Sequence, residues 1–579
     1  MTLRPFQPTD EQRRVIEYAG PAFISACPGS GKTRVMVERA RHLLGGPRPA
    51  RGVAFLSFTN AAVSELELRL RVDGLLPSPA FPHFIGTFDS FIWQFLIAPF
   101  GVPGCNGPAH LIPDKDDMTV KPFDAARELP LGCFDRATGE IVPAVAQRLG
   151  FDPGVKAALT KAYETTARKR RAQYLEKGEL DFTDVRDLAK ARLTDAELGP
   201  RLAGALSGRF SELIVDEAQD CNPADLDIIK WLRDAGIVVK IISDPHQSIY
   251  AFRGGVTEQL IAFGETFQLQ ERLTMSGNFR SSDAICKAIV ALRSRDARAV
   301  VDQALGDYRH EASPIHILSY SGRRVPETIG AKFQELAGAL NLDISQCPVL
   351  AATRNSGRRA IGQPEEASSG EMTVRLAEAV TGFHFAFETA NRRTALENLH
   401  RIILELEGHL TSVSYHQHLK AQGMDRFAWR PRILQLACDL RYDPAVHATV
   451  DAWHDHAKAL LAPCIPAGVT INQRLRRTAG LADALSLAPV TCAPAKTIHS
   501  VKGMQFPAVC VVMTSQTAKG ILDYLETGNP HDSAEDAREI YVAASRAERL
   551  LVIAVPKSQA MRLEAHLGSS GAQISLMEL

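Results

Sequence analysis

Ala26-Cys-Pro-Gly-Ser-Gly-Lys-Thr33 stands between an apolar run, PAFISA at 21–26, and an amphipathic run, TRVMVERARHLL at 33–44. It matches the phosphate-loop pattern except that Ala26 takes the place of the first glycine. Gly29 and Gly31 allow backbone N–H groups to turn toward a phosphate, and the N-terminus of the following helix favours negative charge. We therefore predict a strand, a loop and a helix that together bind a nucleoside triphosphate.

The loop and a second apolar run, ELIVDE at 212–217, supply the side chains that phosphate chemistry needs. Lys32 is expected to neutralise the β- and γ-phosphates, and the Thr33 hydroxyl to bind Mg²⁺. Asp216 and Glu217 end the run ELIVDE, so Asp216 is predicted as the second magnesium ligand and Glu217 as the general base for water. A lone Asp-Glu pair is common on solvated surfaces, but this pair ends a buried-strand pattern in a chain with a phosphate loop. ATP and Mg²⁺ are the expected cofactors.

Short apolar runs alternate with amphipathic stretches in two regions of the chain, which is typical of parallel α/β sheets. The expected strands are 21–26, 52–58, 212–217 and 238–244 in the first region, and 316–320, 348–353, 508–513 and 550–555 in the second. Helical patterns dominate the long inserts at 92–205 and 360–487. The predicted fold class is α/β, with two parallel-sheet lobes that are each interrupted by a mainly helical insert.

Composition excludes some classes of protein. With 579 residues the chain is too long for one core, so three or four domains are expected. No segment approaches the roughly 20 apolar residues that span a bilayer, and MTLRPFQPTDEQ has no apolar signal core, so we expect a cytoplasmic protein without membrane contact. The 66 basic and 66 acidic residues argue against a coating protein that binds DNA through bulk charge. They do not argue against a translocase, which needs only a local groove of phosphate contacts and stacking surfaces.

Further segments continue the pattern in a fixed order. DEAQD (216–220), SDPHQSIYAFRGG (243–255), FTNAAVSELELRL (58–70), GTFDSF (86–91), GNFRSS (277–282), TIHSVKGMQF (497–506) and EDAREIYVAASRAE (535–548) resemble the motifs of UvrD/Rep/PcrA-type superfamily 1 DNA helicases. The resemblance implies two RecA-like lobes with inserts. The first lobe (1A) would comprise 1–91 and 206–272, its insert (1B) 92–205, the second lobe (2A) 273–359 and 488–579, and its short insert (2B) 360–487.

The same resemblance implies roles at the nucleotide. Gln12 is similar to a glutamine that reads adenine, since a carboxamide can pair with both the N6 and N7 positions. Phe279 stands where an aromatic ring stacks on the base, and Gln247 would sense the γ-phosphate. Arg280 and Arg546 would act as arginine fingers from the second lobe. The other expected nucleotide-binding residues are Ala26, Cys27, Pro28, Gly29, Ser30, Gly31, Arg34, Gly503 and Gln505.

Single-stranded DNA needs flat groups on which bases stack. By resemblance the stacking residues are Phe58, Tyr250 and Phe252, although core packing is the alternative for any aromatic beside a strand. Asn60, Thr87, Arg253 and His499 are expected to contact the backbone or base edges, while a structural role is the alternative for His499. The basic run Arg168–Arg171 is equally consistent with duplex phosphates and with a solvated helix face.

The chain departs from the family pattern at several points. Gln505 replaces an acidic residue in KGMQF, and Asp89 stands where histidine is common. The block that normally joins the second insert to its lobe is absent, and the chain ends soon after LLVIAV, where we expect no nuclease domain. The compact form is also similar to the helicase subunit of Gabija defence systems.

The sequence therefore predicts an ATP-dependent 3′-to-5′ single-stranded DNA translocase or helicase in repair, recombination or anti-phage defence. The expected partners are single-stranded DNA, or a duplex with a single-stranded tail, and also a nuclease or repair protein. A phosphate-loop kinase or GTPase is one alternative, although no guanine-reading signal follows the acidic motif. Another alternative is a DNA-stimulated ATPase subunit that regulates or recruits a partner nuclease and unwinds little itself.

Overall fold

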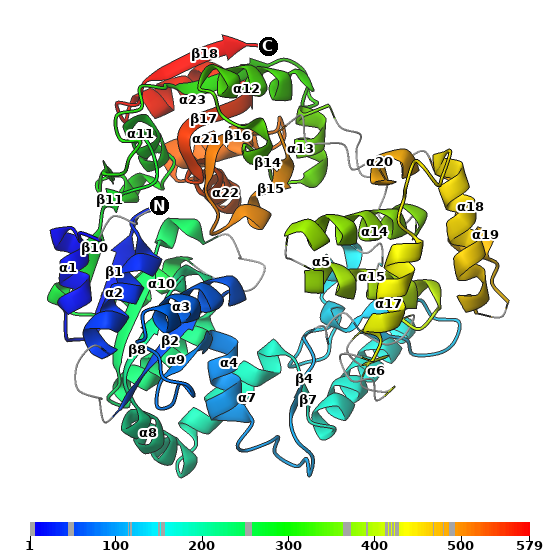
Figure 1. Ribbon diagram of the computed structural model, residues 1–579. Helices are drawn as coiled ribbons and strands as arrows, with labels where there is room; N and C mark the ends of the chain where they lie inside the picture. The colour runs from blue at the N-terminus through cyan, green and yellow to red at the C-terminus, as the bar shows by residue number, and fades with distance from the viewer. Residues whose placement is uncertain are drawn as a thin grey trace. The chain divides into compact units, whose positions relative to one another are not determined.

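The computed structural model describes residues 6–44, 51–113, 115, 118–148, 151, 157–248, 257–362, 372–389, 392–410, 415, 418–419, 422, 428–466, 468–478, 480–485 and 493–579 (Figure 1). The chain divides into two compact units. The first unit consists of Met1–Leu96, Arg186–Glu365 and Val490–Leu579, and the second of Ile97–Val185 and Glu366–Pro489. Both sheets lie in the first unit and most of both inserts in the second, so the boundaries of the four expected domains stay a prediction.

The first sheet has six strands in the order β10-β1-β9-β8-β2-β3, and every neighbouring pair is parallel. Its strands are β1 (Ala22–Ala26), β2 (Gly52–Ser57), β3 (Phe84–Thr87), β8 (Phe210–Val215), β9 (Val238–Ser243) and β10 (Arg272–Met275). Ile24, Phe55 and Ile214 share a buried core with α2. Because parallel strands end at the same edge, the residues after β1, β8 and β9 are brought together there.

The second sheet also has six parallel strands, in the order β15-β14-β16-β17-β13-β18. These are β13 (Ile315–Tyr320), β14 (Val349–Ala351), β15 (Ala495–Thr497), β16 (Phe506–Val512), β17 (Ala547–Pro556) and β18 (Ile574–Glu578). All eight expected strands are present in the two sheets, which confirms the predicted fold class. A short parallel pair, β11 (Gly277–Asn278) with β12 (Gln303–Ala304), lies between the two sheets in the sequence.

Helices connect the strands of both sheets. Those of the first sheet are α1 (Asp10–Glu17), α2 (Lys32–Leu44), α3 (Asn60–Val72), α4 (Phe88–Ile92), α8 (Leu198–Arg209), α9 (Pro223–Asp234) and α10 (Thr257–Glu265). Those of the second are α11 (Asp283–Ala291), α12 (Thr328–Ala339), α13 (Arg354–Ala360), α21 (Ala518–Thr527), α22 (Ala534–Ala544) and α23 (Lys557–Gly568). The helix α7 (Phe182–Thr194) crosses the boundary between the two units.

Each insert has a hydrophobic core of its own. The first contains α5 (Pro143–Arg148), α6 (Ala157–Glu176) and the short strands β4 (His110–Leu111), β5 (Thr119–Val120), β6 (Leu129–Pro130) and β7 (Glu179–Leu180). The second contains α14 (Met372–Thr389), α15 (Arg392–Leu406), α17 (Arg430–Asp439), α18 (Val450–Leu461), α19 (Ile471–Arg474) and α20 (Leu481–Leu485). None of the helices in the described residues combines the length and the apolar run that a bilayer crossing requires.

Candidate active site

The loop between β1 and α2 has the backbone of a phosphate cradle. Gly29 and Gly31 have φ angles of +70° and +78°, a region that side-chain-bearing residues rarely adopt. The Lys32 Nζ donates to the Cys27 carbonyl at 3.3 Å, so the lysine folds back over the loop. Both glycines are therefore required by conformation, and the N-terminus of α2 follows them directly.

The same loop contacts the segment that leads into the second sheet. The Phe279 N–H donates to the Gly29 carbonyl at 2.9 Å. A Cβ atom on Gly29 would lie only 2.4 Å from Asn278 Oδ1 and 2.7 Å from the Arg280 Cβ. The glycine thus permits close approach of Asn278–Arg280, which brings the expected base-stacking ring and the first expected arginine finger next to the phosphate loop.

Gln12 supports the loop from α1. Its Nε2 donates to the Ser30 carbonyl at 2.9 Å, and its Oε1 accepts from the Thr9 N–H at 3.0 Å in the capping box of the helix. The side chain is buried, with 2% of its surface exposed. In this structure both polar atoms of the carboxamide bind the protein, and its role in reading adenine stays a prediction.

The acidic pair follows β8, as expected. Asp216 is fully buried, and burial, together with the charge of Glu217, raises its pKa to about 7. Burial alone would also raise the pKa of Glu217, but the charges of Lys32 and Lys502 outweigh it, so this pKa is lowered. Glu217 is therefore ionised at neutral pH, which a general base requires.

Glu217 has a φ of 54°, one of only two positive φ angles among the described non-glycine residues. This left-handed conformation is rarely adopted by residues with side chains and persists where the surroundings enforce it. The Asp216 Oδ1 accepts from the Glu217 N–H at 2.9 Å, and the Gln219 amide donates to the Glu217 carboxylate. These bonds hold the carboxylate at the pocket.

Side chains from both sheets meet at the expected γ-phosphate position. Arg546, between α22 and β17, donates to the Gln247 Oε1 in the segment after β9. Arg280 donates from Nη1 to the Ser545 carbonyl at 2.8 Å and from Nε to the Gln505 Oε1 at 3.3 Å. Burial lowers the pKa of Arg280 to about 9, with the nearby charge of Arg546 as the next cause. With a pKa of about 9, Arg280 remains cationic at neutral pH, as stabilisation of phosphate charge requires. Burial also lowers the pKa of Arg546.

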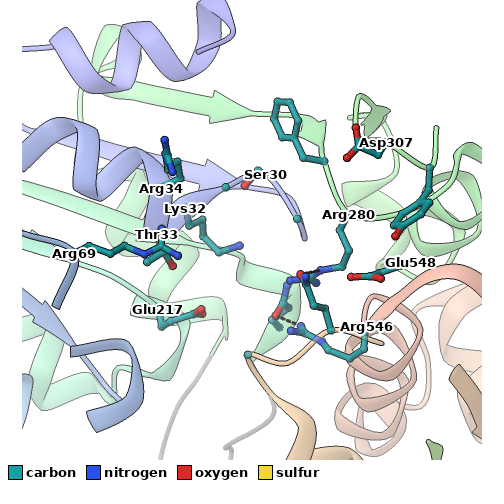
Figure 2. Close-up of a pocket in the computed structure, with 17 residues that line it drawn as sticks. Ser30, Lys32, Thr33, Arg34, Arg69, Glu217, Arg280, Asp307, Arg546 and Glu548 are labelled. Carbon is teal, nitrogen blue, oxygen red and sulfur yellow. Dashed lines mark hydrogen bonds between the residues drawn. The ribbon is translucent and has the colours of Figure 1, made fainter. Parts of the chain in front are cut away.

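These groups enclose a pocket of about 480 Å³. Figure 2 shows Lys32, Thr33 and Glu217 on one side of it, with Arg280 and Arg546 on the other. The lining residues are Gly29, Ser30, Gly31, Lys32, Thr33, Arg34, Arg69, Glu217, Gln247, Phe279, Arg280, Asp307, Tyr308, Gly503, Gln505, Arg546 and Glu548. Phe279 is 39% exposed, so part of its ring surface is available to a ligand.

Most of the expected nucleotide-site residues lie in this lining, but not all of them. Gln12, Ala26, Cys27, Pro28 and Asp216 are outside it. Asp216 lies beneath the surface beside Glu217, and Ala26 ends the buried strand β1. The predicted contacts of these five residues with nucleotide or metal stay predictions.

Four lining residues were missed by sequence reasoning: Arg69, Asp307, Tyr308 and Glu548. Arg69 comes from α3, and Asp307 and Tyr308 follow β12. Glu548 lies two residues beyond Arg546 within a segment that matched the family pattern, so proximity to the arginine was its one available signal. Arg69 also lies within a segment that matched the family pattern, FTNAAVSELELRL, whereas nothing in the local sequence sets Asp307 and Tyr308 apart from surface residues.

Three of the candidate DNA-binding residues follow or end strands of the first sheet. Phe58 and Asn60 follow β2, and Thr87 ends β3. The Phe58 ring stacks on Phe88 with centroids 5.6 Å apart, and Thr87 Oγ1 accepts from the Ser90 N–H at 3.1 Å to cap α4. Asn60 is exposed and Phe58 is half-buried.

On the second sheet, His499 Nδ1 lies 3.7 Å from a Glu539 carboxylate oxygen. The other candidate DNA-binding residues, Tyr250, Phe252 and Arg253, lie outside the described residues. The structure therefore places four of the seven candidates, and their DNA contacts stay predictions.

Comparison with known proteins agrees with this geometry. Residues 8–268 match the family model of the UvrD/REP helicase N-terminal domain. YjcD of Bacillus subtilis is 27% identical over 52% of this chain and 40% of its own length. The ATP-dependent DNA helicase PcrA of Staphylococcus epidermidis is 26% identical over 48% of this chain and 39% of its own length. The ATP-dependent DNA helicase Rep of Escherichia coli is 25% identical, over 48% and 42% respectively. The matches thus span about two fifths of each of these relatives.

Proposed function

We propose that this chain, whose residues 8–268 belong to the UvrD/REP helicase N-terminal domain family, is an ATP-dependent translocase and helicase that moves along single-stranded DNA. The observation that carries the proposal is the composition of the pocket. The phosphate loop, Glu217 and Gln247 follow strands of the first sheet, whereas Arg546 directly precedes β17 of the second sheet. Arg280 follows β11 of the short separate pair β11–β12. A nucleotide bound there would touch both sheets, so its hydrolysis can change how they contact each other.

The residues present fit a magnesium ion. Thr33 lines the pocket and Asp216 is buried beside it, next to a second carboxylate, and magnesium prefers such oxygen ligands together with substrate phosphates. Thr33 and Asp216 would hold the ion. When bound, it would neutralise phosphate charge.

The chain's own residues account for the remaining steps of hydrolysis. Lys32 and the loop N–H groups bind the phosphates, and Phe279 offers a stacking surface to the base. Glu217 accepts a proton from the attacking water, and Gln247 contacts the γ-phosphate and orients that water. Arg280 and Arg546 stabilise the charge that develops on the transferred phosphoryl group.

We infer movement on DNA from the positions of the candidate DNA-binding residues. Phe58, Asn60 and Thr87 follow strands of the same sheet that carries the phosphate loop. A change in contact between the sheets would therefore shift these three residues against His499, which follows β15 of the second sheet. The 3′-to-5′ direction and a role in repair, recombination or anti-phage defence are further parts of the proposal, supported by resemblance. A cytoplasmic location stays an expectation from the sequence.

A streptavidin-displacement assay tests the proposal. Single-stranded oligonucleotides with biotin at the 5′ or the 3′ end are incubated with streptavidin, the protein, ATP and Mg²⁺. A 3′-to-5′ translocase speeds displacement from the 5′ end only, and Glu217→Gln abolishes the effect. Displacement from the 3′ end only would reverse the proposed direction, and displacement from neither end would contradict translocation.

A further inference from the structure

A buried tyrosine joins the two sheets behind the pocket. Tyr541, on α22, is 1% exposed, and its hydroxyl donates to the Asp244 Oδ2 at 3.1 Å. Asp244 directly follows β9 of the first sheet, whereas α22 packs against β16 and β17 of the second. The hydroxyl is therefore part of the contact between the sheets, although it does not line the pocket.

Asp244 connects this hydroxyl to the groups expected at the γ-phosphate. The Oδ2 that accepts from Tyr541 also accepts from the Gln247 Nε2 at 2.8 Å. The Asp244 N–H donates to the Gln219 Oε1 at 3.1 Å, and the Gln219 amide in turn donates to the Glu217 carboxylate. Asp244 is 1% exposed, so no solvent replaces these bonds when one is lost.

The Tyr541 hydroxyl is also linked by hydrogen bonds to the neighbourhood of Phe279 and Arg280. Arg293 Nη2 donates to the Tyr541 hydroxyl at 3.4 Å and to the Asp302 Oδ2 at 2.5 Å. Asp302 precedes β12, which pairs with β11 through Gly277–Gln303 and Asn278–Ala304. Phe279 and Arg280 directly follow β11, so these two residues and Asp302 flank the same pair of strands.

We propose that Tyr541 is a positioning residue that couples the γ-phosphate groups Gln247 and Glu217 to the segment carrying Phe279 and Arg280. It acts through Asp244 on one side and through Arg293 and Asp302 on the other, all of which are buried. The proposal rests on the proposed function, since it assigns a role within the same ATP site. Only ATP carries the γ-phosphate that Gln247 and Arg280 are expected to contact, so the loss of the Tyr541 hydroxyl should weaken ATP binding more than ADP binding.

Tyr541→Phe tests the coupling, because it removes the hydroxyl and keeps the ring. Tyr320→Phe is a matched control: Tyr320 on β13 is also 1% exposed, but its hydroxyl donates at 2.8 Å to the Met513 carbonyl within the second sheet's own region. For each protein we would measure the affinity for a non-hydrolysable ATP analogue and for ADP, the kcat and KM for ATP with saturating oligo(dT), and the melting temperature.

Tyr541→Phe is expected to weaken analogue binding about tenfold relative to ADP binding, the size of one charge-assisted hydrogen bond, and to lower kcat. Tyr320→Phe is expected to keep the wild-type ratio even if its melting temperature falls. A wild-type ratio in Tyr541→Phe would overturn the coupling. If Tyr541→Phe does not fold, Arg293→Met, which removes the donor that Tyr541 and Asp302 share, must shift the ratio in the same direction. Failure of the unmodified protein to bind the analogue would contradict the proposed function instead.

Discussion

Glu217 combines a left-handed φ of 54° with a lowered pKa, and both place an ionised carboxylate at the pocket wall. We predict that Glu217→Gln lowers the DNA-stimulated kcat at least about 100-fold, since general bases contribute about that much, while nucleotide affinity is kept. Turnover by phosphate release and binding by a fluorescent analogue are the measurements. Glu311→Gln, which alters a carboxylate paired with Arg549 outside the pocket lining, is the control and is expected to keep full turnover. Turnover within a few-fold of wild type in Glu217→Gln would exclude it as the base.

Phe58 is half-buried and stacks on Phe88, which is fully buried. If bases stack on its ring, Phe58→Ala should weaken oligo(dT) binding about 5- to 100-fold, because stacking contributes about 1–3 kcal/mol per base. Fluorescence anisotropy at one fixed salt concentration measures the change. Phe81→Ala removes an aromatic ring of the same sheet region that is 68% exposed, and it is expected to bind as wild type does. Equal affinities for the two variants would show that Phe58 serves packing only.

The phosphate loop is the element in which conformation and close contact can be separated experimentally. A Cβ on Gly29 would meet both a positive φ and the atoms of Asn278 and Arg280, whereas Gly236 has a φ of +91° and nothing within 4 Å of an added Cβ. Gly29→Ala is therefore expected to lower ATPase turnover more than about 100-fold, and Gly236→Ala to lower the melting temperature only. A modest loss of turnover in Gly29→Ala would contradict the tight approach of the two segments.

The central strand β9 carries a buried lysine that predicts a pH effect. Lys240 is 2% exposed and donates to the Tyr18 and Gly20 carbonyls at 2.7 and 2.8 Å, and burial lowers its pKa to about 8. Between about pH 8 and the ordinary lysine pKa the unfolded chain binds more protons, so folding stability rises with pH. Wild type should gain melting temperature over Lys240→Met between pH 7.5 and about 9.5. A difference that does not change with pH would show that Lys240 titrates as an exposed lysine does.

The sequence predicted the inner strands of both sheets and missed the outer ones. The missed strands β3, β10, β15 and β18 are the four edge strands. An inner strand is buried on both faces and therefore forms a continuous apolar run, such as LIV within β8. An edge strand such as β15, with the sequence AKT and partial exposure at each residue, has no such run. Its place in the sheet depends on pairing with β14, which no local pattern records.

At the scale of the whole molecule, the sequence predicted the pocket residues that belong to motif segments. It did not predict those that reach the pocket only through the pairing of distant segments. Lys32, Glu217, Arg280 and Arg546 belong to motif segments, and all four line the pocket. Asp307 and Tyr308 reach it only because β12 pairs with β11 beside Phe279. Asp307 and Glu548 add two carboxylates to that of Glu217 in a lining that also holds Lys32 and four arginines. The long-range placement of Asp307 leaves no local signal.

In the proposed function, one pocket couples ATP hydrolysis to movement on single-stranded DNA through groups from both sheets. The most direct measurement is the steady-state ATPase rate of the unmodified protein with and without oligo(dT), beside Lys32→Ala as the inactive control. We predict that saturating oligo(dT) raises kcat at least about tenfold and that Lys32→Ala abolishes turnover in both conditions. An ATPase rate that depends on Lys32 but is unchanged by single-stranded DNA would contradict this coupling.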